Sequence, residues 1–480
     1  MRPSPALVLA ALPAVIGLPA SADAAATARV SVADTGVQGN GHSISPSISA
    51  DGRYVAYTSG ASNLVPGDTN TCFPYPQRGS CPDIFVRDLQ ARTTTRVSVN
   101  VLGQEANDFS DQPTLSADGR YVAFSSWASN LVPGDTNICD LSIGNPFASC
   151  GDVFVHDRET GDVVRVSVAS DGTQGNGSSG QPALSADGRF VAFSSAASSL
   201  VPGDTNGAED IFIHDRDADE DGIFDEPGQI ATSRVSVSSA GGQANGWNLY
   251  PDLSADGRYV VFQSDATNLV PGDTNLVYDI FVHDRVTSRT RRVSVSREGT
   301  QGNDYSLGPP TISADGRYVA LRSAATNLVP EPDLNGYYYD VFVHDRDADE
   351  DGIFDESGAI DITRVSESSE GIQANSFAFL SVISDDGRAV MFWSEASNLV
   401  PDDTNGVADI FLHHRITGRT IRLSVASDGT QANDQSLYYG AGLSADGRRS
   451  VFYSLASNLV PGDSNDATDV FIRAFRRPHR

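Results

Sequence analysis

Ser-Ala-Asp-Gly-Arg-Tyr-Val-Ala-Phe-Ser, at Ser116–Ser125, is the stretch that decides the fold. Its Ala-Asp-Gly centre favours a tight turn, because Gly accepts a positive φ and Asp caps its own backbone. The alternating aromatic and β-branched residues that follow favour a strand. The string Ser-Ala-Asp-Gly-Arg, or Ser-Asp-Asp-Gly-Arg in one copy, begins at Ser49, Ser116, Ser185, Ser254, Ser313, Ser384 and Ser444. The chain is therefore built from seven repeats.

Each repeat predicts four strands. A first strand ends at the turn serine, as in Pro113–Ser116, and a second follows the turn, as in Arg120–Ser125. After a loop such as Ser129–Asn137, a third strand has the pattern Asp-Ile-Phe-Val-His-Asp (Asp279–Asp284) and a fourth the pattern Arg-Val-Ser-Val (Arg292–Val295). A β-solenoid and a propeller both repeat strands without helices. Four-stranded units favour an all-β, seven-bladed β-propeller of four-stranded blades.

The two ends of the repeat region are complementary. The last copy runs through Asp469–Arg473 and has no Arg-Val-Ser-Val segment after it, whereas Arg29–Val32 supplies one before the first copy. We expect the N-terminal strand to complete the last blade, because such closure removes the free sheet edges that invite aggregation.

The Ser-x-Asp-Gly turn, its apolar strand and the Asp-Ile-Phe-Val-x-Asp segment resemble the WD-like repeats of TolB-like β-propellers. The resemblance covers about residues 27–475. Family repeats usually carry Pro where this chain has Ala or Asp385 before the turn Asp, a change expected to have little effect on the turn. The TolB protein also has an extra N-terminal domain, and we expect none in this chain, because the repeats fill nearly all of it. The resemblance implies the fold and a role as a binding scaffold.

The N-terminus is typical of a secretory signal peptide. Arg2 precedes an apolar stretch, Ala6–Leu18, and small residues suited to cleavage follow it. The apolar stretch is too short to span a bilayer, which takes about 20 residues. We assign residues 1–24 to a signal peptide and residues 25–480 to the propeller. The protein is expected to be secreted or periplasmic, with no membrane insertion.

Four cysteines agree with export. Cys72 and Cys81 fall in one loop, and Cys139 and Cys150 in another, so we predict the disulfides Cys72–Cys81 and Cys139–Cys150. Four cysteines also allow two other pairings. A zinc site is the competing interpretation, but the CxxC spacing typical of zinc ligands is missing.

The net charge of −29, with arginine as every basic residue besides histidine, argues against two classes of partner. Such a surface repels nucleic-acid phosphates and anionic lipids. We expect an extracytoplasmic protein or glycan as the partner, and a monomer.

Two acidic loops have the pattern of a calcium-binding loop, with aspartates at alternate positions and a glycine at the sixth. The twelfth position, usually Glu, is Gly228 or Gly358, so later acids must compensate. An acidic solvated hairpin is the alternative, although close carboxylates repel one another without a cation. We predict two structural calcium ions, with the ligands Asp217, Asp219, Asp221, Asp225 and Glu226 and the ligands Asp347, Asp349, Asp351, Asp355 and Glu356.

Histidines recur at one position of the third strand, at His156, His214, His283, His344 and His413. Equivalent positions lie in different blades, away from the axis, so these side chains cannot share a metal at the required distance of about 2 Å. A repeated structural hydrogen bond is expected instead. The Asp-x-Asn loops, such as Asp204 and Asn206, are likewise predicted to form Asx turns in preference to cation sites.

The sequence shows no nucleophile or metalloprotease motif and no phosphate-binding loop, so we predict that the protein is not an enzyme. Some TolB-like propellers are polysaccharide lyases, and this is the alternative. A lyase needs a histidine near the channel, and His42 is the one outside the repeated histidine position and the basic C-terminal region. A purely structural envelope protein is a third reading.

The repeats differ most where the chain enters the first strand of each blade. Blades one and three have small residues there, whereas later blades have aromatic ones. We predict a one-sided ligand face for a peptide or glycan, formed by Trp247, Tyr250, Tyr305, Phe377, Phe379, Tyr438 and Tyr439. The alternative is that these rings only fill the channel.

Overall fold

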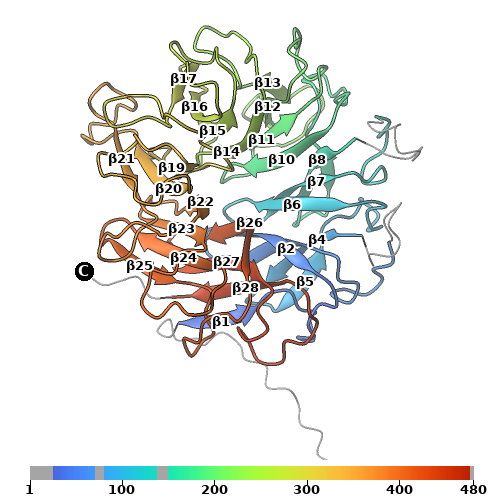
Figure 1. The fold of residues 1–480 in the computed structure, drawn as a ribbon. Coiled ribbons are helices and arrows are strands. Elements are labelled where there is room, and N and C mark those ends of the chain that lie inside the picture. Colours follow the sequence, from blue (N-terminus) through green and yellow to red (C-terminus); the bar gives the residue numbers. More distant parts are fainter. Residues whose placement is uncertain (1–24, 71–80, 138–149, 476–480) are drawn as a thin grey trace, which may run out of the picture.

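Seven four-stranded antiparallel sheets form a ring in the computed structural model of the chain (Figure 1). Residues 25–70, 81–137 and 150–475 are described, together with the side chains of all of these except Leu380 and residues 437–439. The signal peptide predicted at 1–24 lies outside this range. In the described chain no helix would reach across a bilayer. The predicted seven-bladed propeller is confirmed.

The strands follow the repeats. Blades 1 to 4 contain β2 (Ser43–Ile48), β3 (Tyr54–Ser59), β4 (Asp83–Asp88) and β5 (Thr93–Arg96); β6 (Ser110–Leu115), β7 (Tyr121–Ser126), β8 (Asp152–Asp157) and β9 (Val163–Arg165); β10 (Ser179–Leu184), β11 (Phe190–Ser195), β12 (Asp210–Asp215) and β13 (Ala231–Arg234); and β14 (Asn248–Leu253), β15 (Tyr259–Ser264), β16 (Asp279–Asp284) and β17 (Arg289–Arg292). Blades 5 to 7 contain β18 (Thr311–Ile312), β19 (Tyr318–Ser323), β20 (Asp340–Asp345) and β21 (Asp361–Arg364); β22 (Ala378–Ile383), β23 (Ala389–Ser394), β24 (Asp409–His414) and β25 (Arg419–Arg422); and β26 (Ser436–Leu443), β27 (Arg449–Ser454), β28 (Asp469–Ala474) and β1 (Ala26–Arg29).

The first strand of each blade is innermost, and the first strands of successive blades contact one another around the axis. The second and third strands are buried on both faces, because each blade packs against two neighbours. Their aromatic residues form the blade core, as where the rings of Phe124 and Phe154 stack 5.9 Å apart. These strands are apolar at nearly every position because both of their faces are buried. A sheet with one face in water would instead alternate apolar and polar residues.

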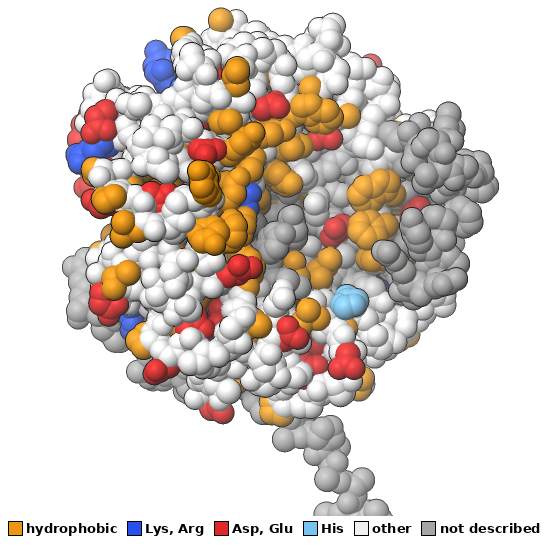
Figure 2. Space-filling view, viewed as in Figure 1, with side chains coloured by type: hydrophobic (Ala, Val, Ile, Leu, Met, Phe, Trp, Pro, Cys, Tyr) orange, Lys and Arg blue, Asp and Glu red, His pale blue; other side chains and the backbone are white. Residues whose placement is uncertain are grey.

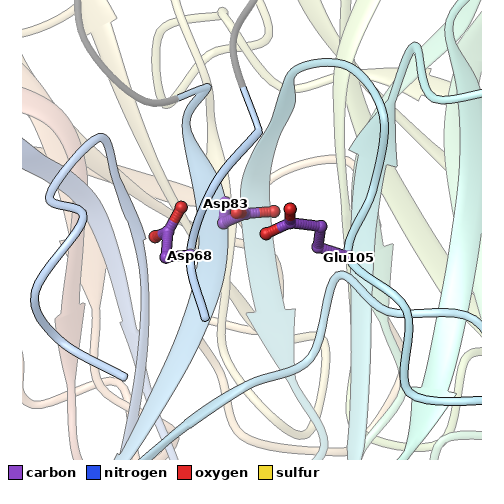
Figure 3. Close-up of side chains that lie close together, drawn as sticks. All are labelled: Asp68, Asp83 and Glu105. Atoms are coloured by element: carbon purple, nitrogen blue, oxygen red, sulfur yellow. The ribbon is translucent and has the colours of Figure 1, made fainter. Parts of the chain in front are cut away.

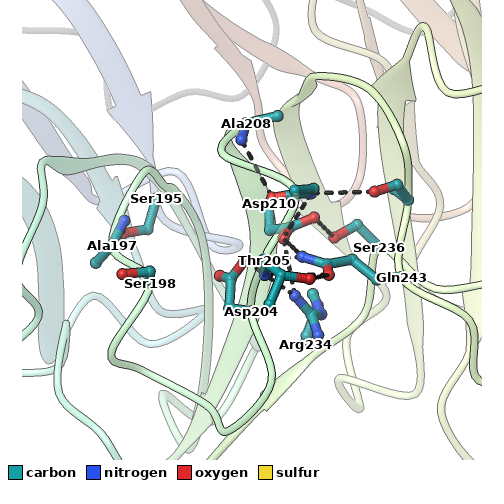
Figure 4. Close-up of polar contacts among 12 residues, drawn as sticks. Ser195, Ala197, Ser198, Asp204, Thr205, Ala208, Asp210, Arg234, Ser236 and Gln243 are labelled. Atoms are coloured by element: carbon teal, nitrogen blue, oxygen red, sulfur yellow. Dashed lines mark hydrogen bonds and ion pairs between the residues drawn. The ribbon is translucent and has the colours of Figure 1, made fainter.

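A buried aspartate begins the third strand of every blade and organises the strand ends (Figure 4). In blade 3, Oδ1 of Asp210 accepts a hydrogen bond of 2.7 Å from the Ser236 hydroxyl, and Oδ2 accepts from Arg234 and Asn206 at 3.1 Å. The Ser236 oxygen in turn accepts the backbone N–H of Ile211. The carboxylate thus joins the preceding loop, the third strand and the segment after the fourth strand.

The aspartate–serine bond recurs in all seven blades with a length of 2.5 to 2.7 Å. The pairs are Asp83–Ser98, Asp152–Ser167, Asp210–Ser236, Asp279–Ser294, Asp340–Ser366, Asp409–Ser424 and Asp469–Ser31. Asn206 also accepts the N–H of Ala208 through its side-chain oxygen, which confirms the predicted Asx turn in this loop.

The N-terminus closes the ring, as predicted. β1 pairs antiparallel with β28, and Asp469 of the last blade binds Ser31 and Arg29, the second at 3.1 Å. The closing strand was, however, predicted at Arg29–Val32, and β1 covers Ala26–Arg29. The serine of each Arg-Val-Ser-Val segment turns inward to its aspartate, so the fourth strand ends at the arginine.

The alanines of the Ser-Ala-Asp-Gly turns link neighbouring blades around the axis. The N–H of Ala50 donates to the carbonyl of Ala117, and the pattern continues through Ala186, Ala255, Ala314 and Asp385, while Ala445 donates to Ala50. A proline at this position has no N–H to donate. TolB-like repeats usually have proline at this position. The alanines of this chain therefore allow backbone hydrogen bonds between blades, which the turn sequence alone did not indicate.

Three of the five repeated histidines make a structural hydrogen bond, at His214, His283 and His413. In blade 3, His214 Nδ1 lies 2.8 Å from the Thr232 hydroxyl, which donates to the carbonyl of Val168 in the preceding blade. His283 and His413 make the same contact with a threonine. Burial lowers the pKa of His214 to about 4, so the ring is neutral at pH 7. The expected structural hydrogen bond is thus present in three of the five blades.

The cysteine loops are described only in part. Cys81 and Cys150 are buried, and neither is a free thiol. Cys72 and Cys139 lie outside the described residues, so both disulfide pairings stay predictions.

Asp252 lies on the innermost strand β14 and links blade 4 to blade 5. Its Oδ2 accepts the N–H of Ile312 at 3.0 Å. Burial raises the pKa of Asp252 to about 6, and the charge of Asp385 adds to the shift despite the hydrogen bonds that oppose it. Ionisation of Asp252 therefore destabilises the folded ring.

Removal of residues 25–40 should lower the melting temperature by at least about 10 °C, because it exposes the edge of β28 and leaves Asp469 without Ser31 and Arg29. Differential scanning calorimetry against a chain that begins at Ala25 measures this effect. Equal melting temperatures would contradict closure by β1.

Asp252→Asn should stabilise the protein more as the pH rises. The folded pKa of about 6 lies above the ordinary value of 3.8, so the wild type keeps the full contribution of this group below about pH 4 and loses it as the pH passes 6. The asparagine oxygen can still accept from Ile312. We expect equal melting temperatures at pH 4 and a gain of about 2 to 4 °C at pH 7.5. The exposed Asp162→Asn is the control, and a gain independent of pH would refute the assignment.

Candidate functional site

The strand order gives the ring two unlike faces. In each antiparallel blade, the Ser-Ala-Asp-Gly turns and the hairpins between the third and fourth strands lie at one end of the strands. The loops between the second and third strands, and those that lead to the next blade, lie at the other end (Figure 1). We call these the turn face and the loop face.

A β-bulge interrupts the innermost strands in most blades. The register shifts between Gly180 and Ala183, and Gln181 has a φ of 56°. Gln112 and Tyr250, at the same repeat position, also have positive φ. The backbone N–H of Gln181 donates to the Gln112 side chain, and that of Tyr250 donates to Gln181 at 2.8 Å. Bulges of this kind redirect side chains. Here the side-chain carboxamides of Gln112 and Gln181 link blades 2, 3 and 4 near the axis.

Aromatic side chains cluster at the loop-face end of blade 6. The rings of Phe377 and Phe379 stack 5.4 Å apart. Tyr338, from the preceding blade, lies 4.2 Å from Phe377, and Tyr339 lies 5.9 Å from Phe379. Phe379 also contacts the buried Trp393 at 5.1 Å. The cluster is therefore anchored in the core of blade 6 and partly open to solvent.

Arg322, on β19, lies against this cluster. Its guanidinium carbon is 4.8 Å from the Tyr339 ring centre and 4.7 Å from the Phe379 ring centre, which are cation–π distances. Nε donates to the carbonyl of Leu307 at 3.0 Å. Gly308 has a φ of 85°, and a Cβ there would come within 3.2 Å of the guanidinium. The positive φ and this close approach both favour glycine here.

Further rings are exposed on the same face. Trp247 of blade 4 is 48% exposed, Tyr305 of blade 5 is 43% exposed, and Trp127 of blade 2 is 38% exposed and packs on Phe109 at 5.3 Å. In Figure 2, hydrophobic side chains gather to one side of the centre of the ring, with a basic side chain among them. We define the aromatic face as Trp127, Trp247, Tyr305, Tyr338, Phe377 and Phe379.

The predicted ligand-face residues divide into three groups. Trp247 and Tyr305 are exposed, whereas Tyr250, Phe377 and Phe379 are half-buried. The side chains of Tyr438 and Tyr439 lie outside the described residues. Phe109 was not predicted as part of this face, although it occupies the same repeat position as Trp247 and is visible in an alignment of the repeats. Arg322 was not predicted either, because no local sequence pattern indicates its role.

The acidic loops bring three of their five predicted ligands together. Oxygens of Asp217, Asp219 and Asp221 lie within 4.8 Å of one another, as do those of Asp347, Asp349 and Asp351. Asp217 is buried and accepts the N–H groups of Asp221 and Gly222 at 3.1 Å.

The remaining predicted ligands are placed differently. Asp225 pairs with Arg216, with Nε 3.0 Å from Oδ1, and Asp355 pairs with Arg346 in the same way at 2.9 Å. Glu226 and Glu356 do not belong to the three-carboxylate groups. Asp225 and Asp355 therefore hold the hairpin to the arginine that follows the third strand of its own blade.

A third acidic group lies in blade 1, where Asp68, Asp83 and Glu105 converge (Figure 3). Arg96 NH1 lies 3.6, 3.2 and 2.7 Å from these carboxylates. Burial raises the pKa of Asp83 to about 7, although Ser98 and Arg96 oppose the shift. This is the repeated aspartate network with Glu105 in place of the usual glutamine, and Arg96 supplies the opposing charge.

His42 is exposed at the loop-face end of blade 1. Its Nδ1 accepts the backbone N–H of Thr468 at 3.1 Å. Nδ1 also lies 3.0 Å from the Thr468 hydroxyl, so this nitrogen is engaged by one residue of the last blade.

Comparisons of sequence give no relative: no family model matches the chain, and no curated protein resembles it.

Comparisons of structure find other propellers. TolB from Acinetobacter baumannii is 16% identical with a TM-score of 0.35, and the match covers 68% of this chain and 54% of TolB. Oligogalacturonate lyase from Vibrio parahaemolyticus is 10% identical with a TM-score of 0.47, over 95% and 92% of the two chains. The propeller domain of the Trilobed protease from Pyrococcus furiosus is 10% identical with a TM-score of 0.48, over 90% and 95%. The TolB-like resemblance of the repeats is confirmed at the level of the β-propeller fold, and at no finer level.

Proposed function

We propose that the protein is a non-catalytic binding module that holds an extracytoplasmic protein or glycan on its aromatic face. The observation that carries this proposal is the exposure of Trp247 and Tyr305 on the same face as a cluster anchored by Phe379 and Arg322. A contiguous exposed apolar patch on a soluble protein often marks an interaction site, whereas single exposed rings are common. Aromatic side chains also lose little conformational entropy on binding, because they have only two rotatable bonds.

The composition of the face favours peptide backbones and sugar rings. Both present flat apolar surfaces together with hydroxyl or amide groups, which rings and tyrosine hydroxyls can contact simultaneously. A channel-filling role does not explain rings that remain about half exposed.

Trp247→Ala and Tyr305→Ala should each weaken binding at least about tenfold without loss of folding, as expected for central aromatic contacts. The measurement is retention of the mature protein's partner from envelope extract or polysaccharide, with melting temperature as the check on folding. Val286→Ala is the matched control, because Val286 is 72% exposed but lies in a hairpin of the turn face. Unchanged retention by both ring variants would contradict the proposal.

A polysaccharide lyase is the alternative function. A lyase needs a base that removes a proton from the sugar ring, and Nδ1 of His42 is already engaged by Thr468. Release of unsaturated products from a bound polysaccharide, lost in His42→Ala, would establish the alternative in place of simple binding.

We also propose that each acidic loop binds a structural calcium ion through Asp217, Asp219 and Asp221 or through Asp347, Asp349 and Asp351. The support is the convergence of three carboxylates on two equivalent hairpins. Calcium prefers six to eight oxygen ligands, so water and backbone carbonyls must complete each site. Asp225 and Asp355, held by arginine, are no longer proposed as ligands in the present geometry.

Calcium at 2 mM should raise the melting temperature by several degrees, since a ligand that binds only the folded state stabilises it. The double variant Asp219→Asn with Asp349→Asn should lose most of this rise, and equal concentrations of magnesium control for ionic strength. Calorimetric titration without heat, together with an unchanged melting temperature, would rule out both sites.

A further inference from the structure

Two acids adjoin the exposed Trp247 on the loop face. The N–H of Asn248, the next residue, donates to the carbonyl of Glu209 in blade 3 at 2.9 Å. The N–H of Trp247 itself donates to Oδ1 of Asp265 at 2.6 Å. Trp247 therefore contacts an acidic residue of the preceding blade and an acidic residue of its own blade.

Tyr278 continues this row toward blade 5. Asp265 and Tyr278 lie just beyond the last residue pair of the ladder between β15 and β16, so they are neighbours. The carbonyl of Tyr278 accepts the N–H of Ser306, which follows Tyr305, at 2.8 Å. Asp304 accepts the N–H of Tyr305 at 2.7 Å. We define the acidic arc as Glu209, Trp247, Asp265, Tyr278, Asp304 and Tyr305.

The blade frame does not require the acids that adjoin Trp247. At the repeat position of Glu209, the other blades have Pro82, Gly151, Tyr278, Tyr339, Ala408 and Thr468. At the repeat position of Asp265, the other blades have Gly60, Trp127, Ala196, Ala324, Glu395 and Leu455. Blade 3 alone has an acid at the first position, and blades 4 and 6 alone have one at the second. These charges are therefore additions to the repeat.

The arc contains no cation of its own. In the part of the chain that the structure describes, no ion pair joins Glu209, Asp265 or Asp304 to a basic side chain, and Arg322 packs in the cluster of blade 6. Burial raises the pKa of Glu209, and no positive charge or hydrogen bond opposes the shift. Burial raises the pKa of Tyr278 as well, and the negative charges of Asp265 and Glu209 add to it. A cation placed on the arc would relieve this unfavourable charge.

We propose that the acidic arc binds an arginine-containing segment of a protein partner. Its guanidinium groups stack on the exposed rings of Trp247 and Tyr305 and pair with the carboxylates beside them. Guanidinium suits this surface because it is planar, stacks on aromatic faces and donates two parallel N–H groups to a carboxylate. A neutral glycan would leave the acids uncompensated, so the charge favours a basic peptide. This assignment rests on the proposed function of the aromatic face and narrows its partner.

The first test uses an acetylated and amidated heptapeptide of alternating glycine and arginine, measured against the mature protein by calorimetric titration at physiological salt. A second peptide with citrulline in place of arginine keeps the shape and removes the charge. The wild type should bind the arginine peptide at least about tenfold more tightly. The double variant Glu209→Gln with Asp265→Asn keeps the size of both side chains and should lose about tenfold in affinity for the arginine peptide.

Glu395→Gln is the matched control, because Glu395 is an exposed acid at the repeat position of Asp265 in blade 6, outside the arc. Its affinity for the arginine peptide should stay within about twofold of the wild type, since exposed charges at a distance are screened by salt. Melting temperatures check that the variants fold. Absence of binding by the wild type, equal affinity for the two peptides, or equal losses in Glu395→Gln and the double variant would each overturn the proposal.

Retention of a partner from envelope extract or polysaccharide separates this proposal from the proposed function. We expect both Trp247→Ala and the double variant to lose the partner, and the arginine peptide to compete with it. Loss of the partner in Trp247→Ala with full retention by the double variant would overturn the arginine assignment. The aromatic face would then remain a binding site, for a glycan or for an uncharged segment of a protein.

Discussion

The buried aspartate at the start of each third strand is the constraint on which the rest of the ring depends. All seven carboxylates are at most 3% exposed, and each accepts a serine hydroxyl from the end of its own blade. A buried carboxylate is unfavourable unless its oxygens are hydrogen-bonded, and loss of one partner is strongly destabilising. The aspartate therefore fixes the position of the loop, the third strand and the fourth strand together, and apolar packing alone would leave these ends free to slide.

The same constraint explains how the chain closes. In six blades the aspartate and serine lie within one repeat, whereas Asp469 binds Ser31 across the whole length of the chain. The N-terminal strand is thus held by the ladder with β28 and by the same polar network as every other fourth strand. Closure needs no further type of contact, because β28 supplies the third strand of the last blade and β1 supplies its fourth.

The repeat positions that vary divide between the two faces. On the loop face, many positions differ and the aromatic residues are concentrated in blades 4 to 6, where Arg322 packs on Phe379. On the turn face, backbone hydrogen bonds link the turn residues from Ala445 through Ala50 to Asp385, and Asp385 is the one turn residue at this position that is not alanine. Because most repeat positions carry the same residue in every blade, a position where one blade differs is a candidate for function.

The sequence predicted the strands and turns that each repeat encodes locally. It did not predict side-chain contacts between segments that are distant in the chain. Seven copies of the Ser-Ala-Asp-Gly turn predicted the blades, their number and the closing strand, because strand period and turn chemistry are local. The pairing of Asp225 with Arg216 was not predictable, since both residues also fitted other roles. Arg322 gave no signal, because its partners come from three other segments. Asp385 was visible as a variant turn, but the hydrogen bond between its carbonyl and Ala314 of the preceding blade was not.

Equilibrium unfolding in denaturant of Ser31→Ala and Ser236→Ala tests the central claim most directly. Both variants remove the hydroxyl that binds the buried aspartate, in the last blade across the termini and in blade 3 within one repeat. If the N-terminus completes an ordinary blade, the two substitutions lower the free energy of unfolding by the same amount, about 1 to 3 kcal/mol each. A loss for Ser236→Ala with none for Ser31→Ala would contradict the account, because it would show that the ring is stable without its closing network.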